Sequence, residues 1–265
     1  MNGSIIRYYK SADKQFSIIC SRGTSKRFPI HRHDSISLGM IIRGMRLLNI
    51  GPARYILCEG DIFIINLEEP HAIAENKNPE HDYIVVSFNK SLIDKYLKTS
   101  GFHFKNIIDD QEISEILCDW FNVLLCKDIP DSSKINIQPV IERLCLFQKE
   151  FGEKEKQSDS IKKIKDILDN EFSDNHSIES LANKAFLSPF HFSRIFKRHT
   201  GMAPHQYLLD NRLQQARKLL GDNFQIIDIA IACGFYDASH FIRHFTNYYG
   251  VPPLKYQKGT HMLKA

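Results

Sequence analysis

A short pattern that occurs twice near the end of the chain constrains the fold more than any other feature. The first copy reads Arg194-Ile195-Phe196-Lys197, followed by Gly201, Pro204 and Tyr207. The second copy reads Arg243-His244-Phe245-Thr246, followed by Gly250, Pro253 and Tyr256, each 49 positions further on. Upstream, Ala182 and Ala230 are offset by 48, so the second copy holds one extra turn residue, which we assign to Tyr236. We therefore expect two similar helical units at a fixed separation.

Capping and turn residues divide each copy into two helices joined by a tight turn. In the first, Ser177 is placed to cap one helix, and Ser188 caps the next, with Pro189 in its first turn. In the second, the turn falls at 233–235, and Asp237 is the expected cap. A helix over 204–220 connects the copies. Helix, short turn and helix is the arrangement in which the second helix enters a DNA major groove.

The first 90 residues have a β pattern. Short apolar stretches alternate with turn residues such as Gly51-Pro52 and Glu59-Gly60-Asp61. The predicted strands include residues 5–6, 16–20, 36–42, 47–50, 55–58, 62–65, 72–74 and 83–88. Many short strands at close spacing are typical of a barrel or jelly-roll sandwich.

Helical periodicity follows the strands. We expect a short helix over 91–99, then an antiparallel hairpin of helices over 111–127 and 137–151. Residues 152–159 are charged and hold no apolar residue, so they are the expected linker. The predicted fold class is α+β in two domains: a β-barrel or jelly roll with a helical hairpin (1–151), and an all-α domain with two helix-turn-helix units (160–265).

Two local patterns in the β region resemble the motifs of the cupin barrel. His31-x-His33 matches the start of the first motif, and the spacing of Gly60, Asn66, Glu68 and His71 matches the second. Asn66 and Glu68 depart from the usual Pro and Gly. Ser37 and Leu38 stand where the first motif has a Glu. The resemblance implies a cupin-like barrel with one usual metal ligand missing.

The second copy also resembles a family signature. Its residues Ile227-Asp228-Ile229-Ala230, Cys233-Gly234-Phe235, Asp237, Ser239, Phe241, Arg243, Phe245, Gly250, Pro253 and Tyr256 look like those of AraC/XylS-type transcriptional regulators. The first copy fits as well, with Arg212 and Ala216 on the connecting helix. The family usually has Lys at position 246, so Thr246 puts a phosphate contact there in doubt. The resemblance implies a sequence-specific DNA-binding regulator that responds to a small molecule bound in the barrel.

The outward positions of the two predicted recognition helices are the candidates for DNA contact. Arginine bidentate to guanine is the commonest base contact, so Arg194 and Arg243 lead, with salt-bridge roles as the alternative. The full set of expected base contacts is Phe190, Ser193, Arg194, Ala238, Ser239, His240 and Arg243. The expected phosphate contacts are Lys197, Arg198 and Arg212. Every other Phe of the repeat is expected in the core.

Three barrel histidines, His31, His33 and His71, are the candidate ligand-binding residues. Contact with a small effector is weighed against structural hydrogen bonding. Three imidazoles with open positions could also hold zinc, iron or manganese. No metal or other cofactor is assigned, because the resemblance points to sensing.

Charge and cysteine usage agree with this interpretation. Residues 158–265 hold 14 Lys and Arg against 10 Asp and Glu, whereas residues 1–157 hold 21 of each. The excess positive charge therefore lies in the region expected to bind DNA. The six cysteines are scattered without a CxxC motif, as in reduced cytoplasmic proteins. No apolar run is long enough for a membrane span.

We expect a cytoplasmic, non-enzymatic activator that acts as a homodimer through the helices of 111–151. Its expected partners are double-stranded DNA and an unidentified effector; RNA polymerase is a further partner compatible with the resemblance. The alternative is a metal-binding cupin enzyme or metal sensor with an appended DNA-binding domain. A third interpretation is a repressor that is controlled by a partner protein instead of a small ligand.

Overall fold

The computed structural model describes residues 5–11, 13–74, 80–96, 103–126, 135–149, 159–221, 224–258 and 261–263. The chain divides into two compact units: residues 1–27, 33–152 and 259–265 form the first, and residues 28–32 and 153–258 form the second. The units differ from the predicted domains at Phe28–Arg32, which groups with the second unit, and at Gly259–Ala265, which groups with the first. Residues 152–158 of the predicted linker lie outside the described residues, and Asp159 already begins a helix.

The first unit is built on two larger sheets and one two-stranded sheet. The strands of the chain are β1 Ile5–Ser11, β2 Phe16–Thr24, β3 Phe28–His31, β4 Ser35–Arg43, β5 Met45–Ile50, β6 Ala53–Cys58, β7 Ile62–Ile65, β8 His71–Ala74, β9 His81–Asn89, β10 His103–Phe104, β11 Ile107–Ile108, β12 Gln148–Lys149 and β13 His261–Leu263. The larger sheet has the order β11-β7-β4-β9-β2-β1-β13, and β8-β5-β6 lie side by side in the smaller one. The eight predicted strands are confirmed. The sequence pattern did not indicate β3 or the short β10 to β13.

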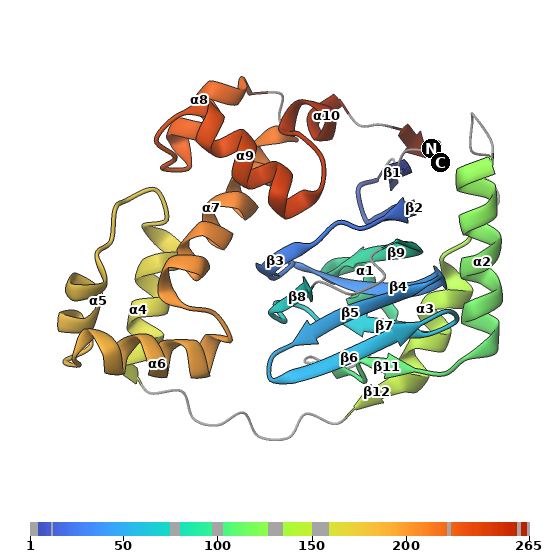
Figure 1. Cartoon of the computed structure of the whole chain (residues 1–265), viewed down its shortest axis with the longest axis horizontal. Helices are drawn as coiled ribbons and strands as arrows, with labels where there is room; N and C mark the ends of the chain where they lie inside the picture. Colours follow the sequence, from blue (N-terminus) through green and yellow to red (C-terminus); the bar gives the residue numbers. More distant parts are fainter. Residues whose placement is uncertain are drawn as a thin grey trace. The chain divides into compact units, whose positions relative to one another are not determined.

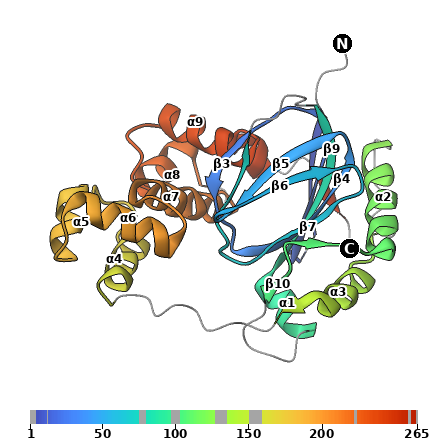
Figure 2. The same cartoon turned by 60° about the horizontal axis from the view of Figure 1, so that its bottom comes forward.

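One face of the larger sheet is covered by helix α2 (Gln111–Cys126), which lies along it (Figures 1 and 2). The central strand β4 is buried from Ser35 to Ile41, because neighbouring strands flank it on both sides and α2 packs against it. Ile113, Leu117 and Trp120 of α2 join the same apolar core as Leu38. Burial of this kind stabilises the fold by about 25 cal/mol for each Å² of apolar surface removed from water.

The helices after the barrel differ in part from the prediction. The short helix is α1 (Lys90–Tyr96), and α2 has a partner in α3 (Gln138–Leu144). The prediction of one helix over 137–151 is wrong for residues 145–149, and residues 150 and 151 lie outside the described part of the chain. A 3₁₀ turn, η2 (Cys145–Phe147), follows, and then β12 pairs with β10, which takes the backbone hydrogen bonds that a continued helix would need.

An ion pair between the half-buried Arg143 and the buried Asp110 joins α3 to the start of α2. Asp110 accepts a hydrogen bond from the backbone N–H of Ile113 and also binds Arg143, with 2.6 Å between Nη2 and Oδ2. The Arg143 hydrogen bond lowers the pKa of Asp110. The carboxylate therefore caps α2 and fixes α3 beside it.

The second unit contains seven helices among its described residues: α4 Asp159–Asn170, α5 Ile178–Lys184, α6 Pro189–Thr200, α7 Pro204–Leu220, α8 Ile226–Ala232, α9 Ala238–Tyr249 and α10 Pro253–Lys258. Helix α7 connects two bundles (Figure 1). Its first half contributes Tyr207 and Leu208 to a core with α4, α5 and α6. Its second half contributes Leu213, Ala216 and Leu220 to a core with α8 and α9. None of the described helices is both long and apolar enough to cross a membrane.

The repeat seen in the sequence is a repeat of hydrogen bonds. After α5, Leu187 N–H donates to Ala182 O at 3.0 Å; after α8, Phe235 N–H donates to Ala230 O at 2.9 Å. The side chains of Ser188 and Asp237 then cap α6 and α9, and left-handed Gly201 and Gly250 end them. Tyr236 lies between Phe235 and the cap residue Asp237. In the first copy, Leu187 is followed directly by the cap residue Ser188. The assignment of the extra residue is confirmed.

Candidate nucleic-acid interface and histidine cluster

Helix α6 presents one polar face and buries the other. Phe192 and Phe196 are fully buried, whereas Arg194 and Lys197 are exposed and Ser193 is half-buried. Phe190 is 80% exposed, although it is a large apolar side chain in the first turn. An exposed aromatic ring beside cationic side chains is available to contact a ligand, including the methyl group of thymine.

Helix α9 repeats this arrangement with smaller side chains. Phe241 and Phe245 are fully buried, and Arg243 and Ser239 are exposed. The other two predicted base contacts, Ala238 and His240, are half-buried. Arg194 and Arg243 each lie six residues after their helix cap, so the two guanidinium groups start from equivalent positions.

The two helices differ strongly in charge. The sequence of α6 carries Arg194, Lys197 and Arg198 and no acidic residue, whereas α9 carries Arg243 as its one Lys or Arg. Each additional cation near a phosphate backbone adds to the counterion release that drives binding. The first helix therefore offers the larger electrostatic attraction to a polyanion.

The expectation that every Phe of the repeat other than Phe190 is buried is wrong for Phe186. This side chain is 93% exposed, and its backbone adopts φ 57°, a left-handed conformation. It occupies the turn between α5 and α6, where the equivalent residue of the second copy is Gly234 with φ 74°. A left-handed turn points the side chain at this position into solvent, which overrides its apolar character.

Arg212, one of the expected phosphate contacts, binds backbone carbonyl groups of its own unit. Its Nε donates to Phe172 O at 2.8 Å and its Nη2 donates to Asp174 O at 2.8 Å. Burial lowers the pKa of this half-buried guanidinium. The side chain satisfies carbonyl groups in the segment that follows α4. We therefore leave Arg212 out of the proposed phosphate contacts.

A buried polar network around Arg32 was missed by the sequence interpretation. Arg32 lies directly after β3, in the segment that groups with the second unit. Its Nε and the Asp210 carboxylate are 2.7 Å apart, and its Nη1 donates to the Tyr207 hydroxyl at 2.9 Å. The guanidinium also stacks on the Tyr207 ring at 3.9 Å and contacts Asn211. Burial raises the pKa of Asp210 to about 6, although Arg32 opposes this shift.

One signal in the sequence could have indicated this network. Tyr207, Asp210, Asn211 and Gln214 follow helical spacing, so the inner face of α7 carries adjacent polar side chains. Such a face needs buried partners. The identity of the partner was beyond reach, because Arg32 is 178 residues away from Asp210 in the chain.

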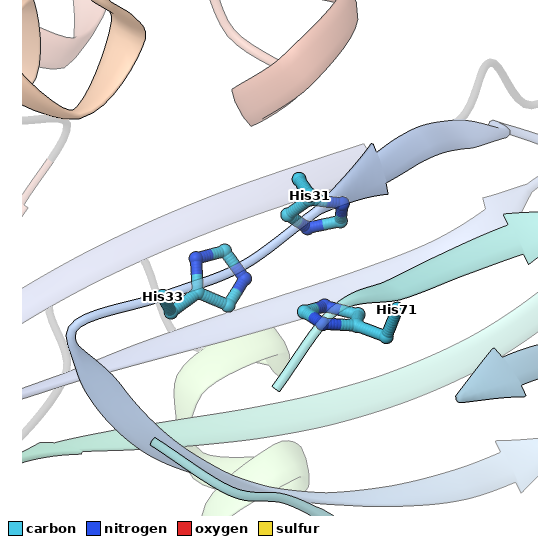
Figure 3. Close-up of side chains that lie close together, drawn as sticks. All are labelled: His31, His33 and His71. Carbon is cyan, nitrogen blue, oxygen red and sulfur yellow. The ribbon is translucent and has the colours of Figure 1, made fainter. Parts of the chain in front are cut away.

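The three predicted ligand-binding histidines lie together. His31 ends β3, His33 follows in a loop, and His71 begins β8. The potential ligand atoms of the three rings all lie within 4.8 Å of one another, and Figure 3 shows the rings grouped. The rings of His33 and His71 are 5.0 Å apart. His31 and His71 are buried, and His33 is half-buried.

Two of these rings have a defined tautomer when neutral. The Nδ1 of His31 is 2.7 Å from Pro29 O, and the Nδ1 of His71 is 3.0 Å from Glu69 O. A carbonyl oxygen only accepts, so Nδ1 carries the proton in each ring and Nε2 carries the lone pair. Metal-binding histidines are commonly held in this way.

Two of the remaining cupin-motif positions, Asn66 and Ser37, have structural partners. The Asn66 side chain accepts from the backbone N–H of Phe104 at 2.7 Å and donates to Phe104 O at 3.1 Å. Ser37, near the position of the missing Glu, hydrogen-bonds to Ser87 at 2.9 Å. These residues hold β10 and β9 in place and add no ligand to the histidine cluster.

Comparison with known proteins agrees with this arrangement. Residues 15–136 match the AraC-like ligand binding domain, and residues 181–259 match a helix-turn-helix domain. The chain is 25% identical over 229 residues to the HTH-type transcriptional regulator YbfI of Bacillus subtilis, covering 83% of each chain. It is 24% identical over 287 residues to the HTH-type transcriptional activator RhaR of Pectobacterium carotovorum, covering 94% of this chain and 93% of RhaR.

A solved structure of ToxT from Vibrio cholerae, with unsaturated fatty acid bound, has a similar fold. The TM-score is 0.50 at 12% identity, and the match covers 98% of both chains. A β-rich ligand-binding domain is thus joined to two helix-turn-helix units whose outer helices carry equivalent arginines. The chain belongs to the AraC family of DNA-binding transcriptional regulators.

Proposed function

We propose that α6 and α9 enter successive major grooves on one face of a DNA duplex, with Arg194 and Arg243 contacting base edges. Successive grooves are about 34 Å apart, which a rigid connecting helix can bridge. The observation that carries this proposal is the equivalence of the two exposed arginines, six residues after Ser188 and Asp237. Phe190, Ser193, Ala238, Ser239 and His240 are the remaining proposed base contacts.

Affinity is divided unequally between the helices in this proposal. Lys197 and Arg198 contact phosphates from α6 and position the protein without reading sequence. Thr246 stands at the position equivalent to Lys197 and carries no charge. The first helix therefore supplies most of the affinity, and the second supplies a narrower contact around His240 and Arg243.

The wider biological role is an effector-controlled, cytoplasmic activator that works with RNA polymerase. Similarity to an activator over nearly the whole chain supports the sign of regulation. A homodimer forms through the helices of 111–151, which would place two second units on one operator. The effector binds in the first unit, and His31, His33 and His71 supply polar contacts to it.

Arginine substitutions test the DNA-binding proposal. The operator is first selected from a random duplex pool with the purified full chain, and affinities are then measured by fluorescence anisotropy. Arg194→Ala and Arg243→Ala should each weaken specific binding by about 1–3 kcal/mol, or roughly 5- to 150-fold, while nonspecific binding stays nearly unchanged. Lys163→Ala, an exposed cation on α4, is the matched control. Unchanged operator affinity in both arginine variants would contradict the base-contact assignment.

A second candidate role for the barrel histidines is metal sensing. It is favoured by one observation: the Nδ1 atoms of His31 and His71 face carbonyl groups, so the lone pair that can bind a metal ion lies on Nε2. Metal analysis of the purified chain distinguishes the two roles. Stoichiometric metal that is lost in His33→Ala and in His71→Ala would support metal sensing. Equal binding of zinc, iron and manganese by the parent chain and these variants would leave effector contact or structural hydrogen bonding as the role.

A further inference from the structure

Two histidines on the second recognition helix face each other. His240 and His244 are four residues apart on α9, so they lie on the same side of the helix. Their Nε2 atoms are 2.9 Å apart, and their rings meet edge to face with centroids 4.5 Å apart. The Phe235 ring lies against both, at 5.7 Å from His240 and 6.4 Å from His244. The pair is a compact set of two nitrogen donors beside an apolar wall.

The first copy shows that packing does not require this pair. The residues equivalent to His240 and His244, 49 positions earlier, are His191 and Ile195. Ile195 packs against the core of the first bundle. The same helix position therefore accepts an apolar side chain, which avoids the cost of burying a polar ring. An imidazole at position 244 needs another explanation.

The protonation state suits a metal ligand. Burial lowers the pKa of His244, and the charges of His240, Arg243 and His205 act in the same direction. The neutral imidazole, which is the form that binds metal ions, is therefore favoured at neutral pH. Arg243 and His205 are exposed, so solvent screens their repulsion of a bound cation.

The distance between the two nitrogens also fits. Zinc binds histidine nitrogen at about 2.0–2.1 Å, so two ligands at an angle of about 90–110° lie about 2.9–3.4 Å apart. We propose that His240 and His244 form a binding site for a divalent transition metal ion such as Zn²⁺ on the second recognition helix. In two neutral rings one proton lies between the Nε2 atoms. On metal binding this proton moves to the Nδ1 atom of its own ring, so both rings stay neutral and both Nε2 lone pairs bind the ion.

The site is built for exchangeable rather than permanent binding. The Nδ1 of His240 is buried without a hydrogen-bond partner among the described residues, so this ring lacks the supporting bond that strengthens many metal sites. Two protein ligands leave the other positions to water. If α9 contacts DNA as proposed above, the metal ion and a base compete for His240, and each weakens binding of the other. That consequence rests on the proposed function; the metal site does not.

Metal titration of the full chain tests the site directly. His33→Ala and His71→Ala are introduced together to remove the barrel cluster, and Zn²⁺ binding is followed by isothermal titration calorimetry. One equivalent should bind, and Co²⁺ should give the visible absorption of nitrogen coordination. His244→Ile, which installs the residue of the first copy, should weaken this binding at least about tenfold. His191→Ala is the matched control and should leave it unchanged.

Two results would overturn the proposal: no equivalent of Zn²⁺ bound in the barrel-cluster background, or equal affinity after His244→Ile. A thermal unfolding scan without metal checks that each variant is folded. His240→Ala gives a second, independent loss of one ligand, and the same titration in the chain with its barrel histidines intact should lose one equivalent in either α9 variant.

Discussion

The two helix-turn-helix units share a backbone but differ in what packs against their turns. Phe186 and Gly234 occupy the same left-handed position, with φ 57° and 74°. Phe186 points into solvent. A Cβ atom on Gly234 would lie 2.2 Å from Ser173 O, in the segment after α4. The hydrogen-bond pattern of a repeat is thus set within each copy, whereas the residue allowed at its turn is set by the neighbouring segment.

Helices α6 and α9 likewise share a set of equivalent residues and differ in the side chains around them. Both use two buried phenylalanines and one exposed arginine at equivalent positions. Around this frame, α6 carries additional cations, and α9 carries a histidine pair in place of His191 and Ile195. The shared residues therefore fix which face of each helix is exposed, and the residues that differ between the two copies decide what that face binds.

The largest expected effect comes from adding a methyl group at Gly234, whose turn packs against Ser173. Gly234→Ala should destabilise the protein by roughly 3 kcal/mol or more, because it combines left-handed strain with a clash against a backbone carbonyl. Chemical denaturation followed by circular dichroism measures the change. Phe186→Gly is the matched change at the solvent-exposed turn of the first copy, and it should alter the free energy of unfolding by less than about 1 kcal/mol. Equal effects in the two copies would contradict the structural difference between the turns.

Much of the helical frame could be predicted from the sequence, because its determinants are local. Ser188, Asp237 and the terminal glycines are caps that act within one turn, and the offset of 49 between copies locates them. The eight strands were predicted for a similar reason, since alternation and turn residues are read within a few positions. The histidine grouping followed from the cupin resemblance and not from local rules.

The features that could not be predicted depend on segments far apart in the chain. Nothing near Gly234 indicates that Ser173 lies against it, and nothing near Arg32 indicates Asp210. Helix α3 ends at Leu144 because β12 pairs with β10, which lies about 45 residues earlier in the chain. In each case a tertiary contact overrides a local preference. Arg212 belongs to the same class, since its partners follow α4.

Arg212 and Lys197 provide the second test, which separates holding a turn from binding DNA. Arg212→Ala removes hydrogen bonds to two carbonyls next to Ser173, and should lower the free energy of unfolding by about 2 kcal/mol. Lys197→Ala should leave stability nearly unchanged and reduce the slope of log K against log salt for DNA binding by about 0.9. Thermal unfolding and salt-dependent anisotropy measure the two quantities. The reverse pattern would return Arg212 to the phosphate contacts.

A third test transfers the histidine pair to the first copy, at a smaller expected cost in stability than Gly234→Ala or Arg212→Ala. Ile195→His places an imidazole four residues after His191 on α6, in the geometry of the α9 pair. Because Ile195 is half-buried, the change should cost about 1 kcal/mol of stability. It should also add one equivalent of Zn²⁺ binding, measured by calorimetry in the background that lacks His33 and His71. Ile195→Asn is the control for polarity and should add none. If Ile195→His folds and gains no metal, then four-residue spacing on this helix frame is not sufficient, and the Phe235 wall beside the α9 pair becomes the feature that positions its rings.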